Sequence, residues 1–138
     1  MDIKSRDILA KTLYFEGGST QGLFDIIFVA WVIRNRMKAQ TWMGKTYIEV
    51  CLKKYQFSCW NGKTLEEIEA IEMNGSFRWR KCLMVAEYVM EEPEKENPFP
   101  GELSHYCNPM LVSPKWARNM KMVSPNLRLD HIFLMEDN

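Results

Sequence analysis

The sequence predicts an α+β fold, a mainly α-helical single domain with a small antiparallel β-hairpin or sheet in its C-terminal part. Three observations support this fold. A chain of 138 residues with 46% apolar and 26% charged residues has the composition of one globular domain. Apolar residues recur at helical spacing as far as residue 91, and they alternate along the chain near the C-terminus. We therefore expect one domain over residues 1–138, with a core from about residue 8 to residue 134.

The first two helices are predicted from the residues at their ends. Asp7 can cap a helix over residues 8–16, and the two glycines that follow would end it. A second helix is expected from a cap at Ser19 or Thr20 to Ala39. The apolar residues of this second helix lie nearly all round it, so we expect it to be central and buried.

Three more helices are expected in the middle of the chain. A short one should cover residues 45–53. Thr64 and Glu67 form a capping box for a helix that runs to about Met73, and a longer helix is expected over residues 77–91.

The C-terminal part contains the predicted sheet. Residues 114–119 fit a short helix with proline in its first turn. Residues 122–123, a turn at 124–126 and an alternating run over 127–134 are typical of a hairpin.

The charge is balanced over the whole chain but uneven along it. The formal net charge is zero, which argues against a nucleic-acid-binding protein. Residues 1–63 carry a local charge of +5 and residues 64–102 a local charge of −6. We expect a basic side formed by the first segment and an acidic back formed by the second.

No targeting or membrane segment is visible. The charged N-terminus lacks the pattern of a secretory signal, and the apolar run at 23–33 is too short to cross a bilayer. The sequence therefore predicts a protein made in the cytoplasm, without stable membrane insertion. It leaves the oligomeric state open.

The four cysteines do not predict a metal site. Cys51, Cys59, Cys82 and Cys107 form no CxxC pair, which zinc sites usually contain. Buried thiols are the ordinary interpretation, although outside the cell the four could form two disulfides in any of three pairings. No metal and no cofactor are expected.

Glu16 is the candidate catalytic residue. It ends an apolar helix directly after Tyr14 and Phe15 and directly before two glycines. A carboxyl group held against aromatic rings is a candidate general acid, because loss of water favours its protonated form. The alternative is an ordinary residue at a helix end that reaches solvent.

Two further sets of residues are candidates for substrate binding. The segment 55–62 alternates polar and aromatic side chains, as sugar-binding loops do, although its aromatic residues could instead hold a loop to the core. Two histidines lie near aromatic residues in the C-terminal part, where they could bind substrate or pack in the core. The candidate binding residues are Gln56, Phe57, Ser58, Trp60, Asn61, His105, Tyr106, Trp116 and His131.

Taken in order, several blocks of the chain resemble the SleB-type cell-wall hydrolase family, which includes spore cortex-lytic enzymes and phage-encoded relatives. The blocks are ILAKTLYFEGGSTQG, VAWVIRNRM, YQFSCWNG, HY, PKWARNM and DHIFL. The resemblance implies a lysozyme-like domain that cuts peptidoglycan glycan strands. It also implies that Glu16 is the essential glutamate, because that residue ends the first helix in this family.

The better-understood members of that family are lytic transglycosylases, which leave a 1,6-anhydro sugar. The resemblance therefore implies cleavage between N-acetylmuramic acid and N-acetylglucosamine, with one glutamate as acid and base. The alternatives are a hydrolysing muramidase, a glycan-binding module that does not cut, and a zinc amidase built on His105, His131 and a cysteine. Such an enzyme would act on the wall after phage release, in a virion or from a spore coat.

Overall fold

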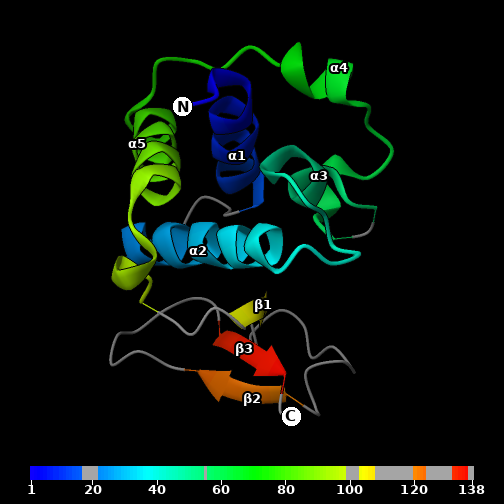
Figure 1. Ribbon diagram of the computed structural model, residues 1–138. Coiled ribbons are helices and arrows are strands. Elements are labelled where there is room, and N and C mark those ends of the chain that lie inside the picture. The colour runs from blue at the N-terminus through cyan, green and yellow to red at the C-terminus, as the bar shows by residue number, and fades with distance from the viewer. Residues whose placement is uncertain (17–21, 55, 99–102, 108–119, 124–131, 137–138) are drawn as a thin grey trace.

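The computed structural model describes residues 1–16, 22–54, 56–98, 103–107, 120–123 and 132–136 (Figure 1). These residues contain five α-helices, two short 3-10 helices and three strands, joined by turns and loops. They are α1 (Ile3–Glu16), α2 (Leu23–Ala39), α3 (Tyr47–Leu52), η1 (Ser58–Trp60), α4 (Leu65–Glu69), α5 (Phe77–Glu91), η2 (Glu94–Glu96), β1 (Leu103–Cys107), β2 (Met120–Val123) and β3 (Ile132–Glu136).

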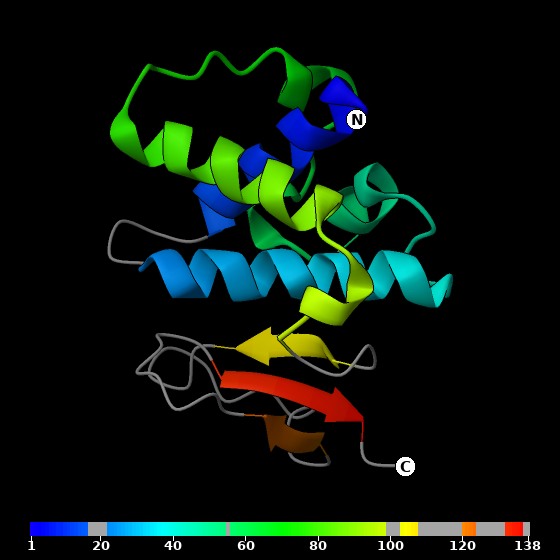
Figure 2. The same ribbon diagram turned by 60° about the vertical axis from the view of Figure 1, so that its left-hand side comes forward.

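Helix α2 lies in the middle of the molecule. On one side it packs against α5 and α3, which both contact α1, and on the other side it contacts β1. Figures 1 and 2 show α2 between the other helices and the sheet, with β1 as the nearest strand. The C-terminal end of α1 is directed toward α2 in Figure 1.

The sheet has three short antiparallel strands in the order β1-β3-β2. The central strand pairs with both neighbours, so that Phe133 lies opposite Tyr106 on one side and Val123 on the other. A register shift interrupts the pairing of β1 with β3 between Leu103 and His105.

The expected α+β class with a C-terminal hairpin is wrong, because helices and not a sheet build the described core. The described residues within 1–98 are 68% helical and contain no strand, and the hydrophobic core found there is built by helices and the loops between them. The described part of the run expected over 127–134 belongs to β3, which continues to Glu136. This strand pairs with β1 as well as with β2, and the sequence did not indicate the pairing with β1. An alternating pattern fixes which residues share a face, but backbone pairing decides where a strand begins. The helix expected over 114–119 and the turn at 124–126 lie outside the described residues.

The prediction that the second helix is central and buried is confirmed. Trp31, Val32 and Ile33 in its middle are at most 1% exposed. This burial follows from the position of α2, because it has helices on one side and a strand on the other.

The helix ends show which capping predictions hold. Thr64 caps α4 by accepting a hydrogen bond from Glu67 N at 3.2 Å, as predicted, but the helix ends at Glu69 and not near Met73. Helix α5 has the predicted bounds, and α2 ends at Ala39 as predicted. Ser19 and Thr20, the caps expected for α2, lie outside the described residues, and α2 begins at Leu23.

The first helix begins one turn earlier than expected. Asp2 takes the capping role that the sequence suggested for Asp7, because its carboxylate accepts hydrogen bonds from Lys4 N at 3.2 Å and Ser5 Oγ at 2.6 Å. Asp7 instead lies inside the helix, paired with Arg6 at 2.8 Å. The predicted end at Glu16 is confirmed.

Buried polar side chains on α2 hold the end of α5. The Arg34 guanidinium donates to Val89 O at 2.7 Å and Glu92 O at 2.6 Å, and it pairs with Glu94 at 3.3 Å. These carbonyls belong to the last turn and the C-cap of α5, where no further turn of helix supplies a donor. Arg34 therefore fixes the point from which the chain continues toward the sheet.

Candidate active site

Glu16 is the last residue of α1 and is partly buried. The helix itself is held in the core by Leu9 and Leu13, which are at most 1% exposed. The carboxyl group therefore stands on a rigid element at the point where the chain leaves the core. Its two following glycines lie outside the described residues.

The loop that contains η1 packs against this end of α1. The indole Nε1 of Trp60 donates a buried hydrogen bond to Thr12 Oγ1 at 2.9 Å. The ring of Trp60 also makes an edge contact with Phe15, with the ring centres 5.6 Å apart. The structure thus brings together two of the features that the sequence singled out, the end of the first helix and the aromatic loop.

Cys59 is the loop residue that meets Glu16. The two side chains are hydrogen-bonded, with the thiol as the donor. Burial, followed by the charge of Glu16 and this hydrogen bond, raises the pKa of the Cys59 thiol to about 12. The thiol is therefore protonated at neutral pH and remains a donor toward the carboxylate. The sequence analysis did not pair these two residues.

The aromatic residues of the loop are covered in this structure. Phe57 is 1% exposed and Trp60 is 6% exposed, and the Arg36 guanidinium lies 5.4 Å from the centre of the Phe57 ring. Both rings hold the loop to the core, which is the alternative that the sequence left open. Ser58 and Asn61 are exposed, and they are the loop residues best placed to meet sugar hydroxyls.

Gln56 is partly buried at the start of the loop, where its backbone N–H donates to Lys53 O at 3.1 Å. The other candidate binding residues belong to the C-terminal part. His105 and Tyr106 lie on β1, the strand that contacts α2. Trp116 and His131 lie outside the described residues, so their predicted substrate contacts stay predictions.

Two hollows lie beside the η1 loop and α3. One, of about 310 Å³, is lined by the loop from Phe57 to Lys63 and by the end of α3. The other, of about 490 Å³, extends from there to Trp42. Leu52, Lys53 and Lys54 line both hollows, which therefore adjoin each other at the end of α3. Trp42 and these lysines were not among the residues that the sequence analysis singled out.

A larger groove lies elsewhere. It has a volume of about 660 Å³ between α2 and α5 and contains none of the predicted site residues. Its lining is almost wholly apolar, with Phe77, Met84 and Tyr88 exposed along α5. Its lining residues include no Asp, Glu or His, the side chains that most often act as acid or base in cleaving a sugar bond.

The described cysteines carry free thiols. Burial raises the pKa of Cys51 to about 12 and that of Cys82 to about 11. Within the part of the chain that the structure describes, no group of three His, Cys, Asp or Glu side chains could hold a metal ion. No helix in that part is long and apolar enough to cross a membrane.

Comparison with known proteins gives one match. Searches of curated proteins and of solved structures found no significant match. A family model described as cell wall hydrolase matches residues 21–134. The match begins shortly after Glu16 and includes the η1 loop, the basic residues beside it, β1, β2 and the first three residues of β3. Because this match spans most of the sequence, the chain belongs to the cell wall hydrolase family, whose members degrade peptidoglycan.

Proposed function

We propose that this protein cleaves the bond between N-acetylmuramic acid and N-acetylglucosamine as a lytic transglycosylase, with Glu16 as the only catalytic acid and base. The observation that carries the proposal is the position of Glu16. It ends a buried helix, and the η1 loop of the family-matched region packs against it through Cys59 and Trp60.

The proposed reaction needs one carboxyl group in two states. Protonated Glu16 gives its proton to the glycosidic oxygen while the bond from that oxygen to the anomeric carbon breaks. The resulting carboxylate then takes the proton from the 6-hydroxyl of the muramic residue, whose oxygen bonds to the same anomeric carbon. The attack is intramolecular, so it gains effective molarity and requires no positioned water. The products are a new 4-hydroxyl end and a 1,6-anhydro sugar, and Glu16 is again protonated.

The acidic residues favour this outcome over hydrolysis. An ordinary glycosidase uses a second carboxylate as nucleophile or base. Asp25, the first acidic residue after Glu16 in the sequence, is 3% exposed in the first turn of α2, where a substrate does not reach it. Asp130 lies outside the described residues. A hydrolysing muramidase at the same site is the second candidate, with Asp130 as its partner carboxylate.

The products distinguish these candidates. We expect purified peptidoglycan digested by the wild-type protein to yield muropeptides lighter by one water than the hydrolysis products, as mass spectrometry would show. Reducing muramic ends in place of anhydro ends would support the muramidase. Intact glycan strands after prolonged incubation would support a binding module without catalysis.

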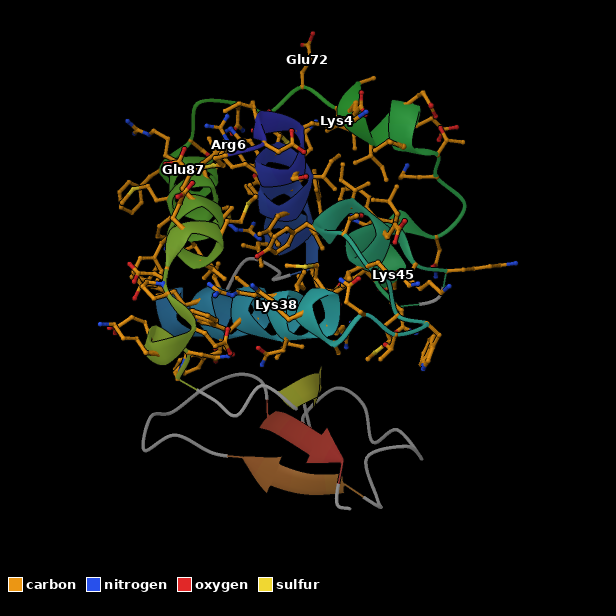
Figure 3. All side chains as sticks on the ribbon, viewed as in Figure 1. Lys4, Arg6, Lys38, Lys45, Glu72 and Glu87 are labelled. Carbon is orange, nitrogen blue, oxygen red and sulfur yellow. The ribbon has the colours of Figure 1, made fainter. Side chains whose placement is uncertain are left out.

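The role of Glu16 is tested by Glu16→Gln, which keeps the shape of the side chain but removes its acid. Product release should fall by about 10³-fold or more, because general acid–base catalysis is lost at both steps. Glu72→Gln is the matched control, since Glu72 is an exposed carboxylate beyond the far end of α1 (Figure 3). Circular dichroism and thermal unfolding would check that both variants fold. Wild-type activity in Glu16→Gln would refute the assignment.

The site of action follows from the substrate. We propose that the protein works at the cell wall, which it reaches during phage release, as part of a virion or from a spore coat. Fractionation of producing cells, with activity followed into the wall fraction, would test this proposal. Activity confined to the interior of intact cells would contradict it.

A further inference from the structure

Trp42 is an exposed aromatic residue on a well-held turn. Its side chain is 66% exposed, while the next residue, Met43, is 7% exposed and holds the turn to the molecule. Tryptophan is enriched at binding surfaces, because its ring combines a large apolar face with a polar N–H group.

The turn around Trp42 is fixed by several contacts. Gly44 N donates to Thr41 O at 3.1 Å, and the Gln40 amide bridges Met37 O and Lys45 O at 2.6 and 2.9 Å. Gly44 has a φ of 130°, and a Cβ there would lie 2.7 Å from Val50 N. Only glycine fits this position. The tryptophan ring is thus presented from a backbone that has little freedom.

Lysines continue from this turn toward the η1 loop. Lys45, Lys53, Lys54 and Lys63 are all exposed, and each lines at least one of the two adjoining hollows. The one acidic residue that lines either hollow is Glu49, whose carboxylate accepts from Lys45 N at 2.8 Å. Figure 3 shows Lys45 on the side of the molecule formed by α3.

This surface includes the loop that contacts the candidate catalytic residue. The hollow next to the loop is lined by Trp60 and Asn61, the two residues that follow Cys59, and Cys59 contacts Glu16. The adjoining hollows are therefore lined by one exposed aromatic ring, four lysines and part of the loop that meets Glu16.

We propose that Trp42, Lys45, Lys53, Lys54 and Lys63, named here the lysine–tryptophan surface, bind the anionic glycan strand of peptidoglycan beyond the bond that is cleaved. Muramic residues carry peptides whose carboxylates are negatively charged, and lysine ammonium groups supply charge-assisted hydrogen bonds to them. The flat indole face packs against the apolar C–H face of a sugar ring. The proposal rests on the proposed function, since it takes peptidoglycan as the substrate.

The test measures binding and not cleavage. Glu16→Gln protein would be sedimented on ice with purified peptidoglycan stripped of secondary wall polymers. In this background, Lys53→Glu with Lys63→Glu should weaken binding by about tenfold at low salt, since two attractions become repulsions. Trp42→Ala should weaken binding by about fivefold, the typical effect of losing one aromatic contact.

A matched control distinguishes binding at the lysine–tryptophan surface from an effect of the protein's net charge. Arg80→Glu with Lys95→Glu makes the same change in net charge on exposed residues of α5 and η2, on the opposite side from α3 (Figure 1). This control should bind within about twofold of the parent. An equal loss in the control would overturn the proposal and indicate general charge attraction or binding at the α2–α5 groove. Unchanged binding in both sets of variants would overturn it as well.

Two further arms identify the bound chemistry. Peptidoglycan whose carboxyl groups have been converted to amides should bind the parent and the double lysine variant equally, while Trp42→Ala still reduces binding. A persistent difference between parent and lysine variant on the amidated wall would contradict carboxylate recognition. Because binding is scored apart from product release, a failure of Glu16 as the catalytic acid would be seen separately in the digestion assay. Circular dichroism confirms that each variant is folded.

Discussion

Glu16 and Cys59 form the contact that most directly concerns the proposed chemistry. A thiol that is partly buried and faces a carboxylate stays protonated, so it can orient the carboxylate without competing for its proton. The contact is reciprocal, because the charge of Glu16 also disfavours the thiolate of Cys59. The interaction can therefore be measured through the reactivity of the Cys59 thiol, independently of catalysis.

Glu16→Gln should make Cys59 easier to alkylate. Removing the negative charge lowers the pKa of the thiol, so more of the reactive thiolate exists at any pH below that value. Iodoacetamide labelling between pH 8 and 10, followed residue by residue by mass spectrometry, would measure the change. Cys82 is the internal control, since burial alone raises its pKa and the charges that act on it are those of Arg78 and Lys81. Identical rates for Cys59 in both proteins would show that the two groups do not interact.

Trp60 and Phe57 show the limit of interpreting single residues from sequence. Polar and aromatic alternation predicted a binding loop, and the loop does lie beside Glu16, but these two rings are the covered part of it. Among the described aromatic residues that line the two adjoining hollows, the exposed one is Trp42, which no motif indicated. Exposure depends on what packs over a side chain, and the sequence pattern does not record this.

At the level of elements, the end of α5 depends on one buried cation of α2. The Arg34 guanidinium donates hydrogen bonds to two backbone carbonyls, one from α5 and one from its C-cap. Its Cζ atom also lies 4.8 Å from the centre of the Trp31 ring. The sequence showed only that the helix becomes polar after its apolar run. That polar stretch is in fact buried, with Arg34 4% and Asn35 1% exposed.

Arg34→Leu should therefore destabilise the fold markedly. It leaves Val89 O buried without its donor, and we expect a loss of about 3 kcal/mol in the free energy of unfolding. Urea unfolding followed by tryptophan fluorescence would measure it. The exposed Arg80, replaced in the same way, should change stability by less than about 0.5 kcal/mol. Equal effects of the two substitutions would show that the hydrogen bonds from Arg34 contribute little.

Some helix ends could be predicted from the sequence and others could not. Thr64 and the end of α2 at Ala39 follow from local rules, since capping depends on residues within one turn. Asp2 and Asp7 are both good caps, and the choice between them depended on whether an additional turn could be accommodated. The start of β3 was not predictable, because it depends on pairing with strands distant in sequence.

At the level of the whole molecule, the described core holds without cross-links. Cys51, Cys59 and Cys82 are free thiols, so packing around α2 and not disulfide bonding stabilises the helical part. The sequence had left two disulfides open for a protein that works outside the cell.

A reducing agent should therefore change the midpoint of thermal unfolding by no more than about 1 °C. A native disulfide would add about 2–4 kcal/mol to the free energy of unfolding, so its reduction would lower the midpoint by several degrees. Differential scanning calorimetry with and without a thiol reductant would check this, and a disulfide-containing protein of similar size serves as the positive control. A clear fall in the midpoint on reduction would contradict the free thiols.

The sequence by itself determined the family, the succession of helices, the buried character of the second helix and the position of Glu16 at the end of the first. These features follow from short-range rules, namely helical spacing, capping and ordered motifs. Only the tertiary structure decided that Cys59 meets Glu16, that Phe57 and Trp60 are covered, and that Trp42 and the lysines stand together. Those relations join residues far apart in the chain, and they depend on how helices pack around α2 and not on any local pattern.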